Sequence, residues 1–357
     1  MCDDGSKRVG PLPNERIPRV PSSLTRTDCT VGVVIPTVGR PQLAQALRSV
    51  LSQTYPPTRI VIAFDGPAAR VNALALPVDP RITIVSSRLR TGVSAMRNAG
   101  IHALDSHLVA LLDDDDEWLP AKLERQVQAY VEAREQGILH PIVATRVFIQ
   151  DVAGTVVATA PIDLLQPGQT VGDYLFRRKR IRRREAMLLP STLLFDRGLA
   201  LEFPFDEALF GGEDRAWLLG VSVRSDTRIV HLHEPLARYT EHRGGKSRSL
   251  SWPASLAWLS AQEDVLSKTE RADSMLCNVA TQALMAHDIR GFFTVLWQAH
   301  HLRAASWRAW FYICFAVFVY AAMDWCLAWM RYGRQLLRTG WLGRIAGFGR
   351  GTPDAGI

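Results

Sequence analysis

The chain contains 357 residues, of which 47% are hydrophobic and 22% are charged, so it is long enough for one large globular domain with an additional segment. Its net charge of +7 favours an acidic partner such as a phosphorylated ligand, anionic lipid or nucleic acid. The five cysteines are scattered without zinc-binding spacing, which argues against a cysteine-based zinc site and indicates reduced thiols in a cytosolic compartment.

Residues 1–28 are rich in Pro, Arg and Ser and lack the apolar core of a signal peptide, so we expect a flexible N-terminal tail. Strand-like apolar runs then alternate with segments of helical spacing. The expected strands are 31–35, 59–64, 81–86 and 107–112, and the expected helices are 41–53 and 91–104. This alternation predicts βα units and a largely parallel sheet, which is an α/β fold.

Five consecutive acidic residues, 113–117, follow the fourth expected strand. So much negative charge at the end of a buried strand is unfavourable unless a positive group neutralises it. Mg²⁺ or Mn²⁺ holding a phosphorylated ligand would do so, because these hard ions prefer carboxylate oxygens. Asp113 and Asp115 are two residues apart and therefore face the same side in an extended backbone. A solvated acidic turn that caps the following helix, 120–136, accounts for the same residues.

Two other polar residues are expected close to this acidic run. Thr37 follows the first strand and Asp65 follows the second. In an open parallel sheet, ligands bind beyond the carboxyl ends of the strands. We therefore expect Thr37, Asp65 and the acidic run to converge at one edge of the sheet.

The pattern changes after Pro141, where alternation predicts further strands and a short helix over 171–177. These strands are expected at 142–149, 155–160, 190–195 and 227–233, and the chain is wholly helical after about 255. The dense basic run 177–184 is either a solvated loop or an anion site for a phosphorylated acceptor or lipid headgroups. No known nucleic-acid-binding motif is present, so a nucleic-acid partner is not expected.

Residues 309–330 are apolar except for Asp324 and rich in aromatic side chains. About 20 apolar residues can cross a bilayer. Arginines on both flanks and the many Trp and Tyr residues favour instead a helix lying at the membrane interface. A spanning helix and a helix buried against the rest of the protein are the alternatives.

Six short segments, taken together and in order, resemble glycosyltransferase family 2. They are Val34-Ile35-Pro36-Thr37, Phe64-Asp65-Gly66, residues 92–101 with Arg97-Asn98, the acidic run through Lys122-Leu123, Phe205-Asp206-Glu207, and Gly212-Glu213-Asp214-Arg215. The resemblance spans roughly residues 30–248 and implies a GT-A fold, with a mostly parallel, Rossmann-like sheet flanked by helices. We expect a catalytic domain over 29–250, a C-terminal helical, membrane-associated region over 251–340, and a tail over 341–357.

The resemblance also implies roles for individual residues. Asp115 would be the principal ligand of Mg²⁺ or Mn²⁺, and Asp113 would face the ribose or the metal. Asp214 matches the catalytic base, although the Glu213-Asp214 pair taken alone could simply complement a helix dipole. The residues that the resemblance places at the nucleotide-sugar donor are Pro36, Thr37, Asp65, Arg97, Asp113 and Asp114.

The chain departs from the family pattern in three places. A single acid, Asp65, stands where the family often has two, and every position of the DxD segment is acidic. The QxxRW motif of processive synthases is absent after Asp214. The last departure predicts the addition of one sugar per encounter.

The expected function is therefore an inverting, metal-dependent transfer of a sugar from a nucleotide-sugar donor to a glycan or lipid-linked acceptor. Such a reaction would serve cell-surface polysaccharide or glycolipid synthesis at the cytoplasmic, anionic face of a bacterial inner membrane. A sugar-phosphate nucleotidyltransferase would need a glycine-rich loop after the first strand, and 36–41 contains one glycine. A non-catalytic nucleotide-sugar-binding module is disfavoured because Asp115 and Asp214 are both present.

Overall fold

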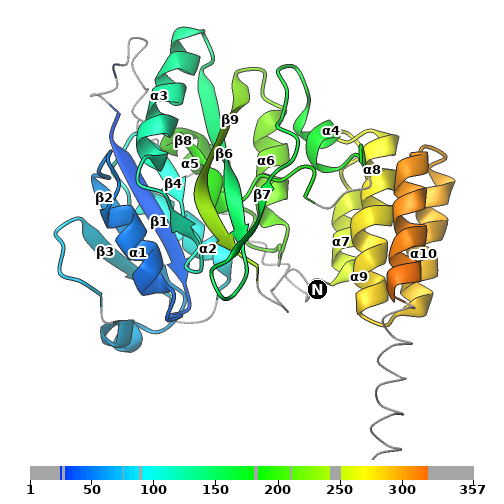
Figure 1. Cartoon of the computed structure of the whole chain (residues 1–357), viewed down its shortest axis with the longest axis horizontal. Coiled ribbons are helices and arrows are strands. Elements are labelled where there is room, and N and C mark those ends of the chain that lie inside the picture. The colour runs from blue at the N-terminus through cyan, green and yellow to red at the C-terminus, as the bar shows by residue number, and fades with distance from the viewer. Residues whose placement is uncertain are drawn as a thin grey trace, which may run out of the picture. The chain divides into compact units, whose positions relative to one another are not determined.

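The computed structural model describes residues 25, 29–74, 76–87, 91–180, 184–209, 211–241 and 251–320. The chain divides into two compact units, shown in Figure 1. Unit 1 consists of Met1–Leu175 and Arg182–Ser249 and contains the sheet, whereas unit 2 consists of Phe176–Ile181 and Leu250–Ile357 and is helical. The expected tails, 1–28 apart from Thr25 and 341–357, lie outside the described residues.

The first half of unit 1 is the predicted alternation of strands and helices. The parallel strands are β1 (Val31–Thr37), β2 (Arg59–Phe64), β3 (Ile82–Ser86) and β4 (Leu108–Leu111), in the spatial order β3-β2-β1-β4. The helices along this half are α1 (Leu43–Leu51), α2 (Val93–His102) and α3 (Lys122–Glu135). Val34 is in register with Val61 of β2 and Leu111 of β4, so these strands end at one edge.

The second half of the sheet is mixed. Its strands are β5 (Glu117–Trp118), β6 (His140–Gln150), β7 (Val156–Ala160), β8 (Leu194–Asp196) and β9 (Thr227–Thr240). β8 pairs antiparallel with both β4 and β6, and β6 pairs parallel with β9. Short helices complete the unit, namely α4 (Val171–Leu175), α5 (Arg197–Glu202) and α6 (Glu213–Ser222).

Two expected strands differ from the structure. The segment 190–195 begins as a 3₁₀ turn, Pro190–Thr192, and only Leu194–Asp196 is strand. The proline ring fixes φ and removes a backbone donor, so a turn is favoured at this position. The strand expected at 227–233 continues to Thr240 because β6 pairs with it along nearly its whole length.

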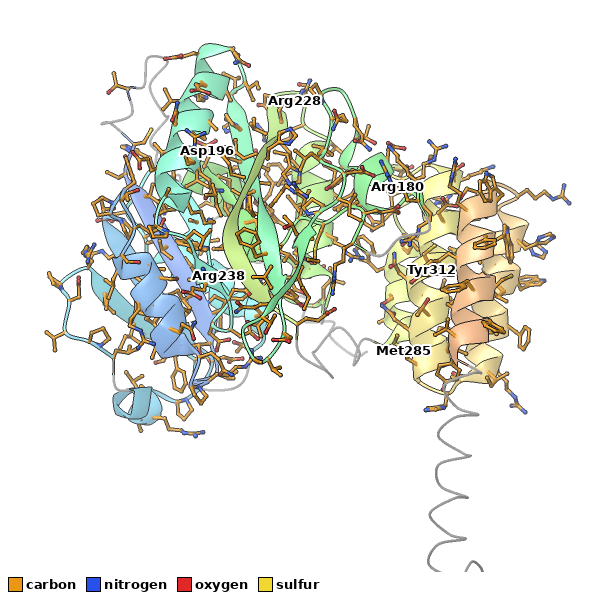
Figure 2. The ribbon with its side chains drawn as sticks, viewed as in Figure 1. Arg180, Asp196, Arg228, Arg238, Met285 and Tyr312 are labelled. Atoms are coloured by element: carbon orange, nitrogen blue, oxygen red, sulfur yellow. The ribbon has the colours of Figure 1, made fainter. Side chains whose placement is uncertain are left out.

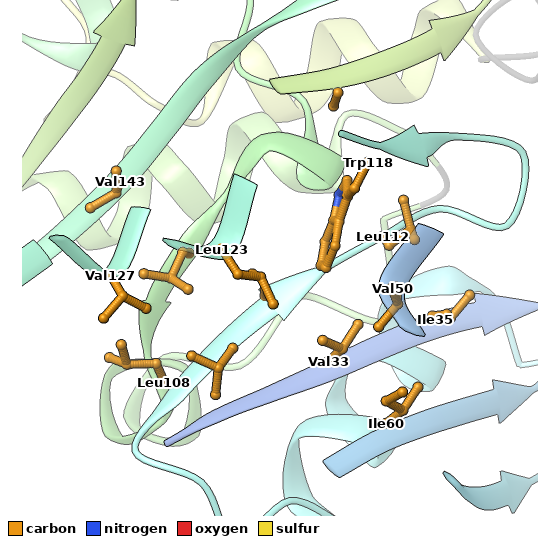
Figure 3. Close-up of a cluster of buried hydrophobic side chains, with 14 of the residues drawn as sticks. Val33, Ile35, Val50, Ile60, Leu108, Leu112, Trp118, Leu123, Val127 and Val143 are labelled. Carbon is orange, nitrogen blue, oxygen red and sulfur yellow. The ribbon is translucent and has the colours of Figure 1, made fainter. Parts of the chain in front are cut away.

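The hydrophobic core lies on both faces of the sheet, because all seven residues of β1 are buried. Figure 3 shows Val33 and Ile35 pointing toward Val50 of α1 and Trp118, on one face. Val34 belongs to the cluster on the opposite face, as the two-residue period of a strand requires. Burial on both faces explains why an uninterrupted apolar run marks this strand in the sequence.

Unit 2 is a set of packed helices. They are α7 (Trp252–Ser260), α8 (Lys268–Ser274), a π-helical turn (Met275–Val279), α9 (Ala280–Met285), α10 (Ile289–His301) and a helix over 307–320. The fully buried Asp273 carboxylate accepts hydrogen bonds from the backbone N–H of Arg178 (2.9 Å) and from both the N–H and Oγ of Ser306 (2.7 and 2.8 Å). One buried carboxylate therefore ties together three parts of the chain.

The apolar segment expected at 309–330 is helical as far as residue 320, and 321–330 lies outside the described residues. Within the part of the chain that the structure describes, no helix combines the length and the apolar character that a membrane crossing requires.

Two helical glycines provide a test of how tightly α2 packs on β1. A Cβ at Gly100 would lie 2.4 Å from Cγ1 of Val34, whereas a Cβ at Gly220 in α6 would meet nothing within 4 Å. We expect Gly100→Ala to lower the free energy of unfolding by about 1–3 kcal/mol through overpacking. The matched Gly220→Ala should raise it by roughly 0.5–1 kcal/mol through helix propensity. Urea unfolding followed by circular dichroism measures both, and equal transitions for the two variants would contradict this packing.

Candidate functional site

The three strand ends named from the sequence converge at one edge of the sheet. The Thr37 hydroxyl donates a hydrogen bond to Oδ2 of Asp114 (2.6 Å), and the backbone N–H of Asp65 donates to the carbonyl oxygen of Thr37 (2.7 Å). Pro36 lies in β1, directly before Thr37, and both residues are buried. The ends of β1, β2 and β4 thus form one polar edge, as the alternation of strands and helices predicts.

The acidic run is a tight turn whose side chains point in different directions. The backbone N–H of Asp116 donates to the carbonyl oxygen of Asp113 (3.1 Å), which closes the turn. The Asp113 and Asp115 side chains are 33% and 22% exposed, whereas that of Asp114 is 7% exposed. Only the first and third acids of the run therefore present a substantial carboxylate surface to a bound ligand.

Asp116 faces the protein interior. The Ser191 hydroxyl donates a hydrogen bond to its Oδ2 (2.5 Å) and accepts one from the backbone N–H of Asp113 (3.1 Å). Burial, together with the charge of Asp113, raises the pKa of the Asp116 carboxyl well above its usual value. Ser191 therefore fixes both ends of the turn, and no feature of the sequence identified it.

Arg40 is a site residue that the sequence analysis missed. Its Nη1 lies 3.1 Å from Oδ1 of Asp114 and 2.5 Å from Oδ2 of Asp115. Burial raises the pKa of Asp114, and the Thr37 hydrogen bond and the Arg40 charge oppose that shift. A basic residue in the loop after the first strand was the available signal, because this loop borders the acidic run.

Arg97 connects the acidic run to the start of α6. This arginine is 2% exposed, and its Nη2 and Nη1 lie 2.8 Å from Oδ1 of Asp113 and 3.1 Å from Oε1 of Glu213. Burial disfavours the charged guanidinium, but the charges of Asp113 and Glu213 outweigh it and raise the pKa of Arg97. The guanidinium also lies 5.5 Å from the centroid of the Phe205 ring. Asp113 and Glu213, which are 100 positions apart in the chain, are thereby held in one cluster.

Asp214 lies in the first turn of α6, which begins after Gly212 in the left-handed conformation (φ 75°). Its neighbour Glu213, whose side chain is 13% exposed, pairs with Arg97, and partial burial raises the pKa of Glu213 against the opposing charge of Arg97. Asp214 is half-buried. Of the two acids, Glu213 is therefore the one paired with Arg97, and the catalytic role that the resemblance implies for Asp214 stays a prediction.

Asn98, which follows Arg97, holds the segment Phe205-Asp206-Glu207. The Asn98 amide donates hydrogen bonds to the carbonyl oxygen of Phe205 (2.9 Å) and to Oε1 of Glu207 (3.0 Å), and accepts one from the Phe205 N–H (2.9 Å). Arg97 and Asn98 thus fix the acidic run, the start of α6 and the segment 205–207 from a single helix.

Asp65 is engaged within the protein. Its carboxylate accepts hydrogen bonds from the Ser87 hydroxyl (3.0 Å) and from the backbone N–H groups of Thr91 (2.8 Å) and Gly92 (3.1 Å). Asp65 therefore holds the segment that precedes α2. Its contact with the nucleotide, which the resemblance implies, stays a prediction.

The donor set of the acidic run fits a hard cation only in part. Among the described residues, no group of three His, Cys, Asp or Glu side chains is arranged to hold a metal ion. Asp113 and Asp115 offer two carboxylates, which suits Mg²⁺ or Mn²⁺ when ligand phosphate oxygens and water supply the other positions. Asp113 contacts Arg97, and Asp115 contacts Arg40. A metal ion that binds Asp115 would therefore have to displace Arg40 from this carboxylate.

Comparison with known proteins adds an independent line of evidence. Residues 32–152 match the family model described as glycosyl transferase family 2. The amylovoran biosynthesis glycosyltransferase AmsB of Erwinia amylovora is 26% identical over 256 residues, which covers 68% of this chain and 81% of AmsB. An Escherichia coli protein, the UDP-Glc:alpha-D-GlcNAc-diphosphoundecaprenol beta-1,3-glucosyltransferase WfgD, is 26% identical over 102 residues, covering 28% of this chain and 42% of WfgD.

Among solved structures, S. aureus TarS 1–349 in complex with UDP superposes with a TM-score of 0.46 and 14% identity, covering 76% of this chain and 91% of the TarS chain. The span matched by the family model contains Thr37, Asp65, Arg97 and the acidic run. It ends before Asp214.

Two arginine variants test how much the ion pairs of buried Arg97 with Asp113 and Glu213 contribute to the free energy of unfolding. Arg97→Gln leaves Glu213 and Asp113 without their cation, so we expect the free energy of unfolding to fall by about 3–5 kcal/mol. Arg125→Gln is the matched control, because the Arg125–Glu234 pair is exposed (46% and 42%) and such pairs contribute about 1 kcal/mol or less. Urea unfolding of the two variants measures the difference, and an equal effect would show that the buried cluster is not what holds the site together.

Proposed function

We propose that this chain is an inverting, metal-dependent sugar transferase of glycosyltransferase family 2, whose family model residues 32–152 match and whose GT-A fold predicts the α/β architecture of unit 1. It would take a sugar from a nucleotide-sugar donor and add it to a hydroxyl group of a glycan or lipid-linked acceptor. The observation that carries the proposal is the Arg97 bridge, which joins Asp113 to the start of α6, where Asp214 lies. A candidate cation site and a candidate general base are thereby brought into one cluster.

The donor half of the reaction depends on the acidic run. When bound, Mg²⁺ or Mn²⁺ would stabilise the negative charge that develops on the departing nucleoside diphosphate. Asp115 and Asp113 would hold the ion because theirs are the more exposed carboxylates of the run. Once Asp115 is released from Arg40, the guanidinium is available to donate hydrogen bonds to diphosphate oxygens, a geometry that arginine favours.

The acceptor half depends on Asp214. A hydroxyl group is a poor nucleophile at neutral pH, so a carboxylate must take its proton as the oxygen attacks the anomeric carbon. Asp214 is suited to this because Glu213, not Asp214, is committed to the Arg97 pair. Attack opposite the leaving diphosphate inverts the anomeric centre, and the proton ends on the Asp214 carboxylate.

The names of two relatives indicate the biological process in which this reaction would take place. AmsB is named for amylovoran biosynthesis, and WfgD for transfer from UDP-Glc to a sugar on diphosphoundecaprenol. We propose a role in bacterial cell-surface polysaccharide assembly, with one sugar added per encounter. The proposed location is the cytoplasmic face of the inner membrane, where a soluble donor would meet a lipid-linked acceptor.

The metal site is tested by Asp115→Asn. We expect this variant to lose the Mn²⁺-dependent part of the thermal shift produced by a nucleotide sugar, because a neutral amide is a poorer ligand for a hard cation. The measurement is a thermal-shift screen with UDP-, GDP- and dTDP-sugars, with and without Mn²⁺. Asp105→Asn serves as the control because Asp105 is exposed and pairs only loosely with Arg59 (3.7 Å). An unchanged Mn²⁺-dependent shift in Asp115→Asn would contradict the assignment.

The general base is tested by Asp214→Asn. This variant should keep the donor-induced thermal shift, since Asp214 is assigned to the acceptor hydroxyl. Release of the nucleoside diphosphate should fall by about 10²-fold or more, the usual contribution of a general base. Nucleotide release from the donor that gives a shift is measured with Asp214→Asn, Asp105→Asn and the unaltered protein. Full turnover by Asp214→Asn would rule out this role.

A further inference from the structure

Two helices of unit 2 carry exposed aromatic and aliphatic side chains at helical spacing. In α10 these side chains are four residues apart, so they lie along one face. The helix over 307–320 repeats the pattern. The seven residues, each 50–70% exposed, are Ile289, Phe293 and Trp297 in α10, and Trp307, Phe311, Phe315 and Phe318 in the second helix; we call them the aromatic face.

The aromatic face is separate from the packing faces of these helices. α10 is packed through the buried residues Phe292, Val295 and Ala299, and the second helix through Ala309 and Ile313. Each helix therefore has an inner apolar stripe that the fold uses and an outer apolar stripe that the described residues leave exposed.

The two helices are neighbours. Near one end, the rings of His300 and Trp310 lie 6.4 Å apart in an edge-to-face arrangement. At the other end, Tyr320 Oη lies 2.7 Å from Nδ1 of His287, just before α10. Contacts at both ends, with the residue numbers running in opposite directions, place the helices side by side and antiparallel. Their outer stripes thus belong to one region of unit 2.

The charged side chains within the two helices have one sign. Residues 289–320 contain no Asp or Glu, and they include the exposed side chains of Arg290, Arg303 and Arg308. The Arg178 guanidinium lies 4.2 Å from the centroid of the Tyr312 ring, which brings the basic segment 177–180 alongside the second helix (Figure 2 labels Arg180 and Tyr312). An apolar stripe bordered by basic groups complements a surface that is apolar inside and negative outside.

We propose that the aromatic face is the surface by which this protein binds an anionic lipid bilayer. Trp and Phe side chains would enter the boundary between headgroups and acyl chains, and the bordering arginines would pair with lipid phosphates. The sequence continues this character, because 321–330 is apolar except for Asp324. The proposal extends the proposed location at a membrane by naming the surface, and it includes α10, which the sequence analysis did not connect with lipid.

The test compares full-length variants in vesicle flotation. The vesicles contain phosphatidylglycerol and phosphatidylcholine in equal parts, or phosphatidylcholine alone. The variant Phe293→Ser/Trp297→Ser/Phe311→Ser/Phe315→Ser should bind the anionic vesicles at least about tenfold more weakly than the unaltered protein, because apolar area is removed from the contact. Arg290→Gln/Arg303→Gln/Arg308→Gln should lose the preference for phosphatidylglycerol and the sensitivity to salt.

The matched control replaces exposed valines of unit 1, in Val78→Ser/Val152→Ser/Val223→Ser, and should bind vesicles like the unaltered protein. Circular dichroism and the donor-induced thermal shift verify that every variant is folded. Nucleotide release is measured in parallel without vesicles, so a failure of the proposed reaction is distinguished from a failure of lipid binding.

Three outcomes would overturn the proposal. The first is that the unaltered protein does not bind anionic vesicles. The second is that the aromatic-face variant binds them as well as the control does. The third is that light scattering shows a dimer of the unaltered protein which only the aromatic-face variant disrupts, without an effect on vesicle binding; the face would then be an interface between two copies of the chain.

Discussion

The site is built around one buried arginine. Arg97 is almost completely buried, and such a charge is tolerated only when anions satisfy it. Asp113 and Glu213 supply them, and they come from the two segments that the proposed reaction needs to hold together. The electrostatic requirement of a single side chain thus sets the distance between the end of β4 and the start of α6.

The neighbouring contacts give each acid of the run a different environment. Asp114 is held by Thr37 and Arg40, and Asp116 by Ser191. Asp113 and Asp115 are the ones with substantial exposed surface, which supports the proposal that they, among four consecutive aspartates, hold the cation. Because Arg40 contacts Asp115, the proposed cation would compete with the Arg40 guanidinium for this carboxylate. We then expect the ion and the nucleotide sugar to bind cooperatively, because the diphosphate would accept hydrogen bonds from the displaced Arg40 guanidinium.

A structural feature could be predicted from the sequence where it depends on neighbouring residues, and could not where it depends on residues far apart in the chain. β1 was predicted because burial on both faces requires an uninterrupted apolar run, and the meeting of Thr37, Asp65 and the acidic run followed from the alternation of strands and helices. β5 was not predicted, because Glu117 and Trp118, at the end of the acidic run, are too few to show a periodicity and pair only with the distant β9. The strand expected at 190–195 was wrong where Pro190 begins a turn. The contacts made by Glu213 and Ser191 could not be predicted, since their partners are separated by 75 or more residues in the chain.

Residues 176–181 belong to the helical unit, although the residues before and after them in the chain belong to unit 1. Phe176 packs against Trp258, with ring centroids 5.9 Å apart, and the Arg178 backbone donates to Asp273. A chain cut after Ser249 would retain every residue of the proposed chemistry and yet lose the partners of a segment that lies between α4 and the 3₁₀ turn bearing Ser191. Residues 176–181 can therefore acquire these contacts only after the later helices have been synthesised, although the chain returns to unit 1 directly after them.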